Sequence, residues 1–142
     1  MERRNFIKNT CIYCLGATAL GATFAELMSC STSGLPIYKT GEVKNILVPL
    51  SLFAQSKVVV VRPSNSEFDI LVVKKADNLY NAFLMECTHR ENPLTATNTG
   101  LYCPAHGSRF DLDGNVTQGP ATEPLQYYKV IINGDNAAIN II

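Results

Sequence analysis

Short runs rich in β-branched residues, separated by turn-forming residues, recur in the chain after residue 40. They occupy residues 45–48, 57–61, 68–74, 79–85, 125–132 and 137–142. The last two runs flank Asn133-Gly134-Asp135-Asn136, and they are predicted to form a hairpin because Asn-Gly tolerates the positive φ of tight turns. No long segment with helical periodicity follows Cys30. The sequence therefore predicts a single all-β domain.

The first 30 residues have the pattern of an export signal. Paired arginines, Arg3 and Arg4, precede an apolar run that ends near Ala25. This run is shorter than the roughly 20 apolar residues of a membrane-spanning helix, so we interpret it as the core of a signal peptide. Residues 3–8 resemble the twin-arginine export signal, which carries proteins that are already folded; the alternative is the basic start of an ordinary secretory signal.

Residues 27–30, Leu-Met-Ser-Cys, resemble a bacterial lipobox. The resemblance implies a cleaved signal peptide over residues 1–29 and a lipid on Cys30. The lipid would hold the protein on a membrane of the bacterial cell envelope, facing the periplasm, without spanning that membrane. The alternatives are an ordinary cleavage site and an uncleaved anchor. Residues 30–40 are polar and contain glycine and proline, so they are predicted to be a flexible tether before a folded domain over residues 41–142.

Both histidines of the chain lie in two short motifs that also contain the only cysteines after residue 30, Cys87-Thr88-His89 and Cys103-Pro104-Ala105-His106. Side chains two or three residues apart on a tight loop can converge, so two facing loops would present two thiolates and two imidazoles. These donors suit an iron–sulfur cluster, and they also suffice for a structural zinc site. The sequence therefore predicts a metal centre held by Cys87, His89, Cys103 and His106.

These two motifs and the residues after them resemble the Rieske [2Fe-2S] proteins, over roughly residues 41–142. The similar segments after the second motif are Gly107-Ser108-Arg109-Phe110-Asp111, Gly114-Asn115-Val116, Gly119-Pro120-Ala121 and Pro124-Leu125. The resemblance implies antiparallel β-sheets with a small cluster-binding subdomain of two ligand loops. It also implies one [2Fe-2S] cluster per chain, with Cys87 and Cys103 on one iron and His89 and His106 on the other.

The chain departs from the members of this family that belong to quinol-oxidising respiratory complexes. Those members carry an extra cysteine in each ligand loop, and here the corresponding places hold Arg90-Glu91-Asn92 and Ala105. Ser108 is retained, and the resemblance implies that its hydroxyl donates to cluster or ligand sulfur, but Phe110 stands where those members have a tyrosine. Residues 119–120, Gly-Pro, are expected to form a third loop that packs against the two ligand loops; the alternative is an ordinary turn.

The residue inventory favours electron transfer over catalysis by this chain alone. No histidine remains for a mononuclear iron site or a hydrolytic triad, and no glycine-rich nucleotide fingerprint follows a strand. Twelve acidic residues balance twelve basic ones, so the chain has no net positive charge that would attract nucleic acid. We therefore expect the chain to exchange electrons with redox proteins that serve as its donor and acceptor.

The expected function is that of an exported one-electron transfer protein, which acts as a carrier or as the small subunit of an oxidoreductase. An alternative is the Rieske subunit of a quinol:cytochrome c reductase, in which the N-terminal segment would remain as an uncleaved anchor. The short apolar run and the absent extra cysteines favour the first function. A structural zinc-binding protein is the remaining alternative.

Overall fold

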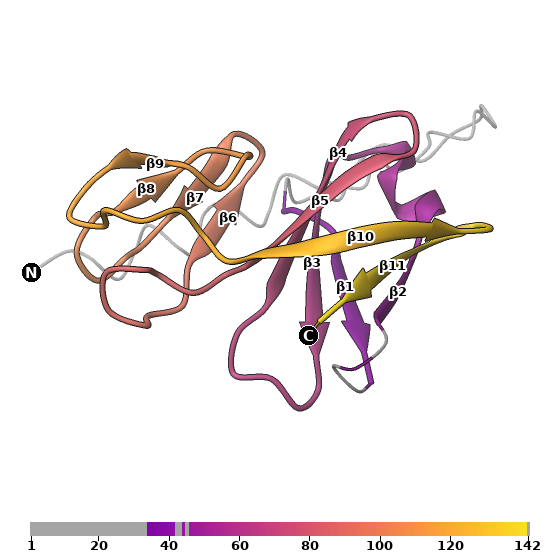
Figure 1. Ribbon diagram of the computed structural model, residues 1–142, viewed down its shortest axis with the longest axis horizontal. Helices are drawn as coiled ribbons and strands as arrows, with labels where there is room; N and C mark the ends of the chain where they lie inside the picture. Colours follow the sequence, from indigo (N-terminus) through magenta and orange to yellow (C-terminus); the bar gives the residue numbers. More distant parts are fainter. Residues whose placement is uncertain (1–33, 42–43, 45, 142) are drawn as a thin grey trace, which may run out of the picture. The chain divides into compact units, whose positions relative to one another are not determined.

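The computed structural model describes residues 34–41, 44 and 46–141, and these residues form two β-sheets (Figure 1). The predicted signal peptide, with Arg3 and Arg4, and the predicted lipid attachment site at Cys30 lie outside the described residues. Within the described part of the chain, no helix has the length and hydrophobicity that crossing a bilayer requires. The predicted all-β class is confirmed.

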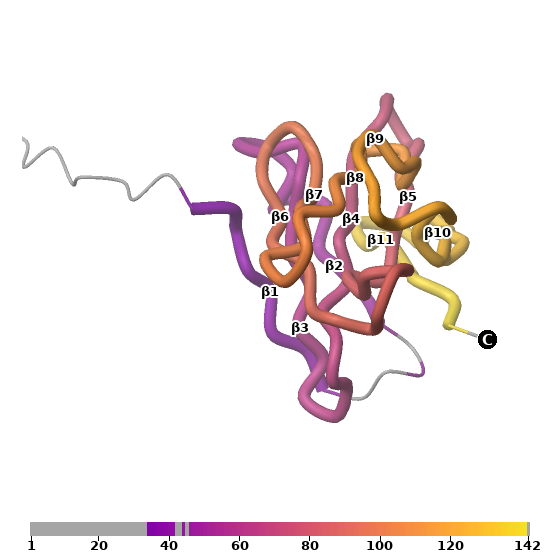
Figure 2. Tube along the Cα trace, turned by 90° about the vertical axis from the view of Figure 1, so that its left-hand side faces the viewer, coloured from indigo at the N-terminus to yellow at the C-terminus, as the bar shows by residue number. Residues whose placement is uncertain are grey.

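The larger sheet contains seven strands in the order β1-β3-β4-β5-β10-β11-β2. Its neighbouring strands are antiparallel except for β1 and β3, which run parallel, side by side (Figure 2). A 3-10 helix, η2 (Leu50–Ala54), follows β2. The strands are β1 (Ile37–Thr40), β2 (Ile46–Pro49), β3 (Val58–Pro63), β4 (Ile70–Ala76), β5 (Leu79–Leu84), β10 (Tyr127–Asn133) and β11 (Asn136–Asn140).

The smaller sheet is formed by the chain between β5 and β10. It is antiparallel, with the strand order β6-β7-β8-β9. Because β5 and β10 pair with each other, through Phe83 with Tyr127 and Ala82 with Tyr128, the chain leaves the larger sheet and returns to it at the same place. The strands are β6 (Thr95–Thr97), β7 (Gly100–Tyr102), β8 (Arg109–Phe110) and β9 (Val116–Gln118).

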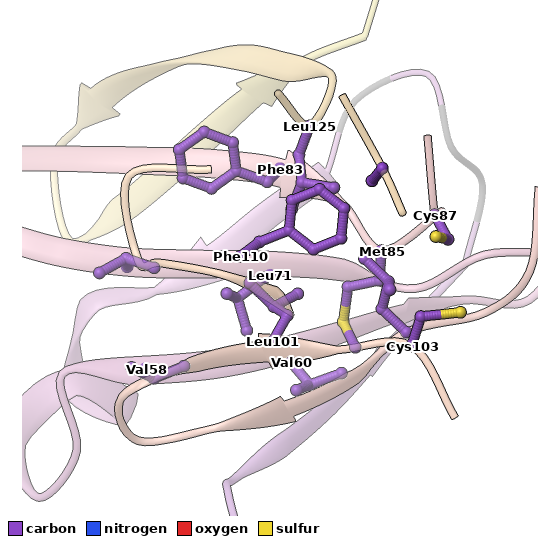
Figure 3. Close-up of a cluster of buried hydrophobic side chains, with 13 residues drawn as sticks. Val58, Val60, Leu71, Phe83, Met85, Cys87, Leu101, Cys103, Phe110 and Leu125 are labelled. Carbon is purple, nitrogen blue, oxygen red and sulfur yellow. The ribbon is translucent and has the colours of Figure 1, made fainter. Parts of the chain in front are cut away.

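Strands β3 and β4 bury side chains on both of their faces, which explains why their sequences are continuous apolar runs. One face contributes Val59, Val61, Ile70 and Val72 to a core that also contains Ile46 and Ile139. The opposite face contributes to a second core, here called the ligand-side core, which reaches the smaller sheet (Figure 3). The ligand-side core consists of Val58, Val60, Leu71, Val73, Phe83, Met85, Cys87, Leu94, Leu101, Cys103, Phe110, Ala121 and Leu125.

The predicted runs correspond to strands, with ends shifted by up to two residues. Each of the six runs overlaps one of the strands β2, β3, β4, β5, β10 and β11. The predicted C-terminal hairpin is confirmed: Asn133 pairs with Asn136, and Gly134 in the turn has a φ of 56°.

The predicted tether over residues 30–40 is too long. Residues 37–40 form β1, whose Ile37 and Tyr38 align with Val60 and Val61 of β3. The folded body therefore starts before Gly41, and one strand pair is parallel where antiparallel sheets were expected. The four-residue run of β1 carries too weak a local signal, and pairing with a strand about twenty residues away decides its conformation.

A glycine substitution tests how closely the loop after β8 packs on β5. Gly114 has a φ of 80°, and a Cβ on it would lie 2.7 Å from Cε1 of the buried Phe83. We expect Gly114→Ala to lower the free energy of unfolding of the apoprotein by about 2–4 kcal/mol, since it combines left-handed backbone strain with overpacking. Gly134→Ala is the matched control, because Gly134 also has a positive φ and no atom lies within 4 Å of its added Cβ. It should lose only about 1 kcal/mol in denaturant unfolding, and equal losses for the two variants would contradict the packing argument.

Candidate metal centre

The first ligand loop, residues 85–94, connects β5 to β6 and is closed by its own backbone. The N–H of Cys87 donates to the carbonyl of Asn92 at 2.8 Å, and the N–H of Leu94 donates to the carbonyl of Met85 at 3.0 Å. Glu91, at the far end of the loop, has a φ of 30°. These two hydrogen bonds close a narrow loop that contains both Cys87 and His89.

The second ligand loop, residues 103–108, connects β7 to β8. The N–H of Cys103 donates to the carbonyl of Ser108 at 2.8 Å, and the N–H of Gly107 donates to the carbonyl of Cys103 at 3.0 Å. Gly107 has a φ of 80°, a left-handed conformation that favours glycine. The loop therefore turns tightly directly after His106.

The structure brings the two predicted histidine ligands close to each other and places the two predicted cysteine ligands in one core. The imidazole rings of His89 and His106 lie with centroids 5.1 Å apart and planes at 86°. Cys87 and Cys103 are free thiols, each 1% exposed, and both belong to the ligand-side core (Figure 3). His106 is exposed, whereas His89 is partly buried. The two loops thus present sulfur donors on the inside and nitrogen donors closer to the surface.

One buried atom shows that this donor set is suited to a metal. Nδ1 of His89 is buried and has no hydrogen-bond partner, which is unusual for a polar atom in a folded protein. In the described residues, no group of three or more His, Cys, Asp or Glu side chains is close enough together to hold a single metal ion. A [2Fe-2S] cluster needs only two protein ligands for each iron, so the four residues fit such a cluster.

A third loop, residues 118–123, packs against both ligand loops, as expected from the Gly-Pro sequence. The N–H of Ala121 donates to Oγ of Ser108 at 3.0 Å, and Ser108 is fully buried. On the side of the first ligand loop, Oγ1 of Thr88 donates to the carbonyl of Glu123 at 2.7 Å. Nε2 of Gln118 donates to the carbonyl of Gly107 at 3.0 Å.

Sequence reasoning missed the contacts of Thr88 and Gln118. Thr88 lies between two predicted ligands, but this position does not indicate that its hydroxyl reaches the carbonyl of Glu123, 35 positions later. Nothing in the sequence around Gln118 indicates that its side chain reaches a residue eleven positions earlier. That contact depends on the β8–β9 pairing, in which Arg109 lies opposite Gln118.

An acidic groove of about 520 Å³ lies beside the first ligand loop. Glu86, Glu91 and Glu123 line it together with Arg90. Desolvation raises the pKa of Glu86 above its ordinary value, and the negative charges of Glu91 and Glu67 raise it further. The charged form of Glu86 is therefore disfavoured next to the candidate centre.

The sequence matches a known family over most of the described domain. Residues 35–129 match the family described as Rieske [2Fe-2S] domain. The cytochrome b6-f complex iron-sulfur subunit of Chlorobaculum thiosulfatiphilum is 36% identical over 78 residues, which cover 53% of this chain and 42% of that protein. Subunit 1 of the same kind from Synechocystis sp. is 34% identical over 73 residues, which cover 49% and 41%. The chain therefore spans less than half the length of these two relatives.

Solved structures share the fold. The cyanobacterial plasma membrane Rieske protein PetC3 from Synechocystis superimposes with a TM-score of 0.56 at 24% identity, over 68% of this chain and 99% of that one. A ferredoxin from Sphingomonas yanoikuyae superimposes with a TM-score of 0.50 at 24% identity, over 68% and 96%.

The family match supports the predicted [2Fe-2S] cofactor over the zinc alternative. It covers both ligand loops and the third loop, and the chemistry of the donor set agrees with it. The chain belongs to the Rieske [2Fe-2S] domain family.

Proposed function

We propose that this protein transfers single electrons through a [2Fe-2S] cluster. Cys87 and Cys103 would hold one iron, and His89 and His106 the other. The observation that carries the proposal is the buried Nδ1 of His89, which has no hydrogen-bond partner. The ring that carries this atom lies 5.1 Å from the ring of His106, between centroids. An imidazole nitrogen in this position is suited to coordinate a metal ion.

The cofactor would supply a one-electron couple, and the reduction potentials of Rieske centres span about −150 to +300 mV. The chain contributes the exposure of His106, which offers an edge of the centre to an approaching redox protein. It also contributes the burial of Cys87 and Cys103, which keeps water from the sulfur side.

Ser108 is proposed to stabilise the reduced centre. Its Oγ accepts the N–H of Ala121, so its own hydroxyl proton remains free to donate to cluster or ligand sulfur. Because Ser108 is fully buried, such a bond would not compete with water. Phe110, which is 2% exposed, adds apolar packing and no further donor.

We propose that the partners are redox proteins that serve as electron donor and acceptor. The expected arrangement is an exported carrier or small oxidoreductase subunit. The alternative is that the chain is the Rieske subunit of a quinol-oxidising complex. The names of the curated relatives, which are iron-sulfur subunits of cytochrome b6-f complexes, favour this alternative. Against this, residues 90–92 and Ala105 stand where such subunits of the respiratory complexes carry additional cysteines.

The proposed location is the periplasmic face of a bacterial membrane. The support is sequence only: the arginine pair at residues 3–4, the apolar run after it and the lipobox-like residues 27–30. In this proposal a twin-arginine signal over residues 1–29 is cleaved after export of the folded protein. Cys30 then carries the lipid, and the residues before β1 form the tether.

The cluster assignment can be tested on the full chain. Anaerobically purified protein should contain iron and acid-labile sulfide in equal amounts, and it should give the EPR signal of a Rieske centre after reduction with dithionite. Cys87→Ser and His106→Ala should each abolish the signal, because each removes a ligand. Cys30→Ser is the control for loss of a cysteine outside the centre, and it should retain the signal. A colourless protein that contains zinc would refute the assignment.

The anchor can be tested by mass spectrometry of the mature chain isolated from bacterial membranes. We expect an N-terminus at Cys30 that carries acyl chains, and we expect Cys30→Ser to release the protein from the membrane fraction. An unprocessed N-terminus embedded in the membrane would instead support the subunit of a quinol-oxidising complex with an uncleaved anchor.

A further inference from the structure

One face of the smaller sheet is exposed to solvent. Its strands, β6 to β9, direct successive side chains to opposite faces (Figure 1). Leu101 and Phe110 lie on the inner face, in the ligand-side core. Thr95, Tyr102 and Arg109 alternate with these inner positions, and all three are exposed. The outer face of the smaller sheet is therefore accessible to another molecule.

These three exposed side chains form one row across three strands. Thr95 of β6 lies opposite Tyr102 of β7, and Tyr102 lies opposite Arg109 of β8. Side chains at directly opposite positions have Cβ atoms about 4.5–5.5 Å apart, so the Tyr102 phenol and the Arg109 guanidinium are neighbours. Tyrosine and arginine are among the residues that most often dominate the binding energy of protein interfaces. The row therefore has the composition of an interface anchor.

A hollow of about 140 Å³ lies beside this row. Its lining includes Thr97, Thr99, Tyr102, Arg109 and Thr117, and none of the lining residues is acidic. Pockets for drug-sized ligands measure about 300–1,000 Å³, so the hollow is too small for such a molecule. At about 30 Å³ for each water molecule it holds about four or five water-sized groups, which is the size of one carboxylate side chain. A guanidinium binds a carboxylate through two parallel hydrogen bonds.

The guanidinium of Arg109 has no carboxylate partner among the described residues. The ion pairs of this part of the chain join Arg62 to Asp69, Lys74 to Asp77 and Lys75 to Asp113. The groove beside the first ligand loop has the opposite charge, because three glutamates and one arginine line it. An acidic partner is attracted by Arg109 and repelled by that groove, and this difference selects where it docks.

The exposed row adjoins the second ligand loop at both of its ends. Tyr102 is bonded to Cys103, and Arg109 follows Ser108. The N–H of Cys103 donates to the carbonyl of Ser108 at 2.8 Å, which closes the loop at this place. A molecule seated on the row is therefore one residue away from a proposed sulfur ligand. The exposed His106 does not line the hollow, so this contact is separate from the histidine edge.

We propose that the outer face of the smaller sheet, here called the Arg109 face and formed by Thr95, Thr97, Tyr102, Arg109 and Thr117, docks an acidic redox partner. A carboxylate of that partner enters the hollow and pairs with Arg109, while Tyr102 packs against the surrounding partner surface. Arg109 holds no metal, and it selects the partner by charge. This inference rests on the proposed electron-transfer function, to which it adds a docking surface and the charge of the partner.

The first test follows oxidation of the dithionite-reduced full chain by stopped-flow absorption. Ferricyanide, a small anion, stands in for the acidic partner: it takes one electron from the reduced centre and becomes ferrocyanide, while the centre returns to its oxidised state. We expect Arg109→Gln to slow this oxidation about fivefold at low ionic strength, since an exposed ion pair contributes up to about 1 kcal/mol and about 1.36 kcal/mol is a factor of ten. High salt should reduce the difference. Oxidation by the cation tris(phenanthroline)cobalt(III), which also takes one electron, should not slow.

Three further variants separate the Arg109 face from general effects of lost positive charge. Lys129→Gln removes one positive charge from an exposed position on β10 and should change the ferricyanide rate less than about twofold. Arg90→Gln makes the identical chemical change in the lining of the acidic groove. It should slow ferricyanide less than Arg109→Gln does. Arg109→Lys keeps the charge but loses the planar fork of donors, so its rate should lie between those of the wild type and Arg109→Gln.

The second test does not depend on a cluster. A hexaglutamate peptide is titrated into the isotope-labelled full chain, and the chemical shifts of the backbone amides are followed. We expect the largest changes at Thr97, Thr99 and Thr117, which line the hollow. Arg109→Gln should abolish these changes while it keeps the far-ultraviolet circular dichroism of the wild type, because Arg109 is exposed and belongs to neither core.

The outcomes distinguish the docking surface from the cluster. Equal ferricyanide rates in Arg109→Gln and Lys129→Gln, or slower oxidation of Arg90→Gln than of Arg109→Gln, would overturn the Arg109 face while the centre stands. Peptide-induced shifts that persist in Arg109→Gln would overturn it as well. A wild-type sample without a reducible centre would overturn the proposed function, and the peptide titration would then still decide whether the Arg109 face binds an acidic chain.

Discussion

The pairing of β5 with β10 is the contact on which the candidate centre depends. It joins Phe83 to Tyr127 and Ala82 to Tyr128, and it is extended by a hydrogen bond from Leu84 to Gln126. All residues of the centre lie in the chain between these two strands. Both ends of that segment are held at one place, and its residues Leu101 and Phe110 share a core with residues of the larger sheet. The ligand-side core then fills the space between the two sheets.

The proposed sulfur and nitrogen ligands have different surroundings because the cysteine and the histidine of each loop lie at different depths. Cys87 and Cys103 are members of the core, whereas His106 is exposed. This arrangement has an electrostatic consequence, since buried sulfur donors sit in a low-dielectric environment while the imidazoles remain within reach of a partner. The acidic residues of the neighbouring groove add negative charge on the side of the first ligand loop, close to His89.

Local sequence patterns were informative where one residue type has one dominant role. The Cys-x-His and Cys-x-x-His motifs indicated the four proposed ligands, because thiolates and imidazoles at such spacing are rarely placed together for packing alone. The long β-branched runs indicated β3 and β4. Strands of two or three residues, such as β8, gave no periodic signal, since at least four residues are needed before alternation can be read. The third loop was expected from Gly119-Pro120, but its anchoring residues were not.

The sequence by itself determined the donor atoms, the class of secondary structure and the family, because these follow from residue identity and short-range spacing. Only the tertiary structure decided that residues 37–40 add a parallel strand and that Gln118 and Thr88 connect the third loop to the ligand loops. Thr88 and Glu123 are 35 positions apart in the chain. The pairing of β5 with β10 brings together the ends of the segment that contains both residues, so no local pattern of residues encodes the contact.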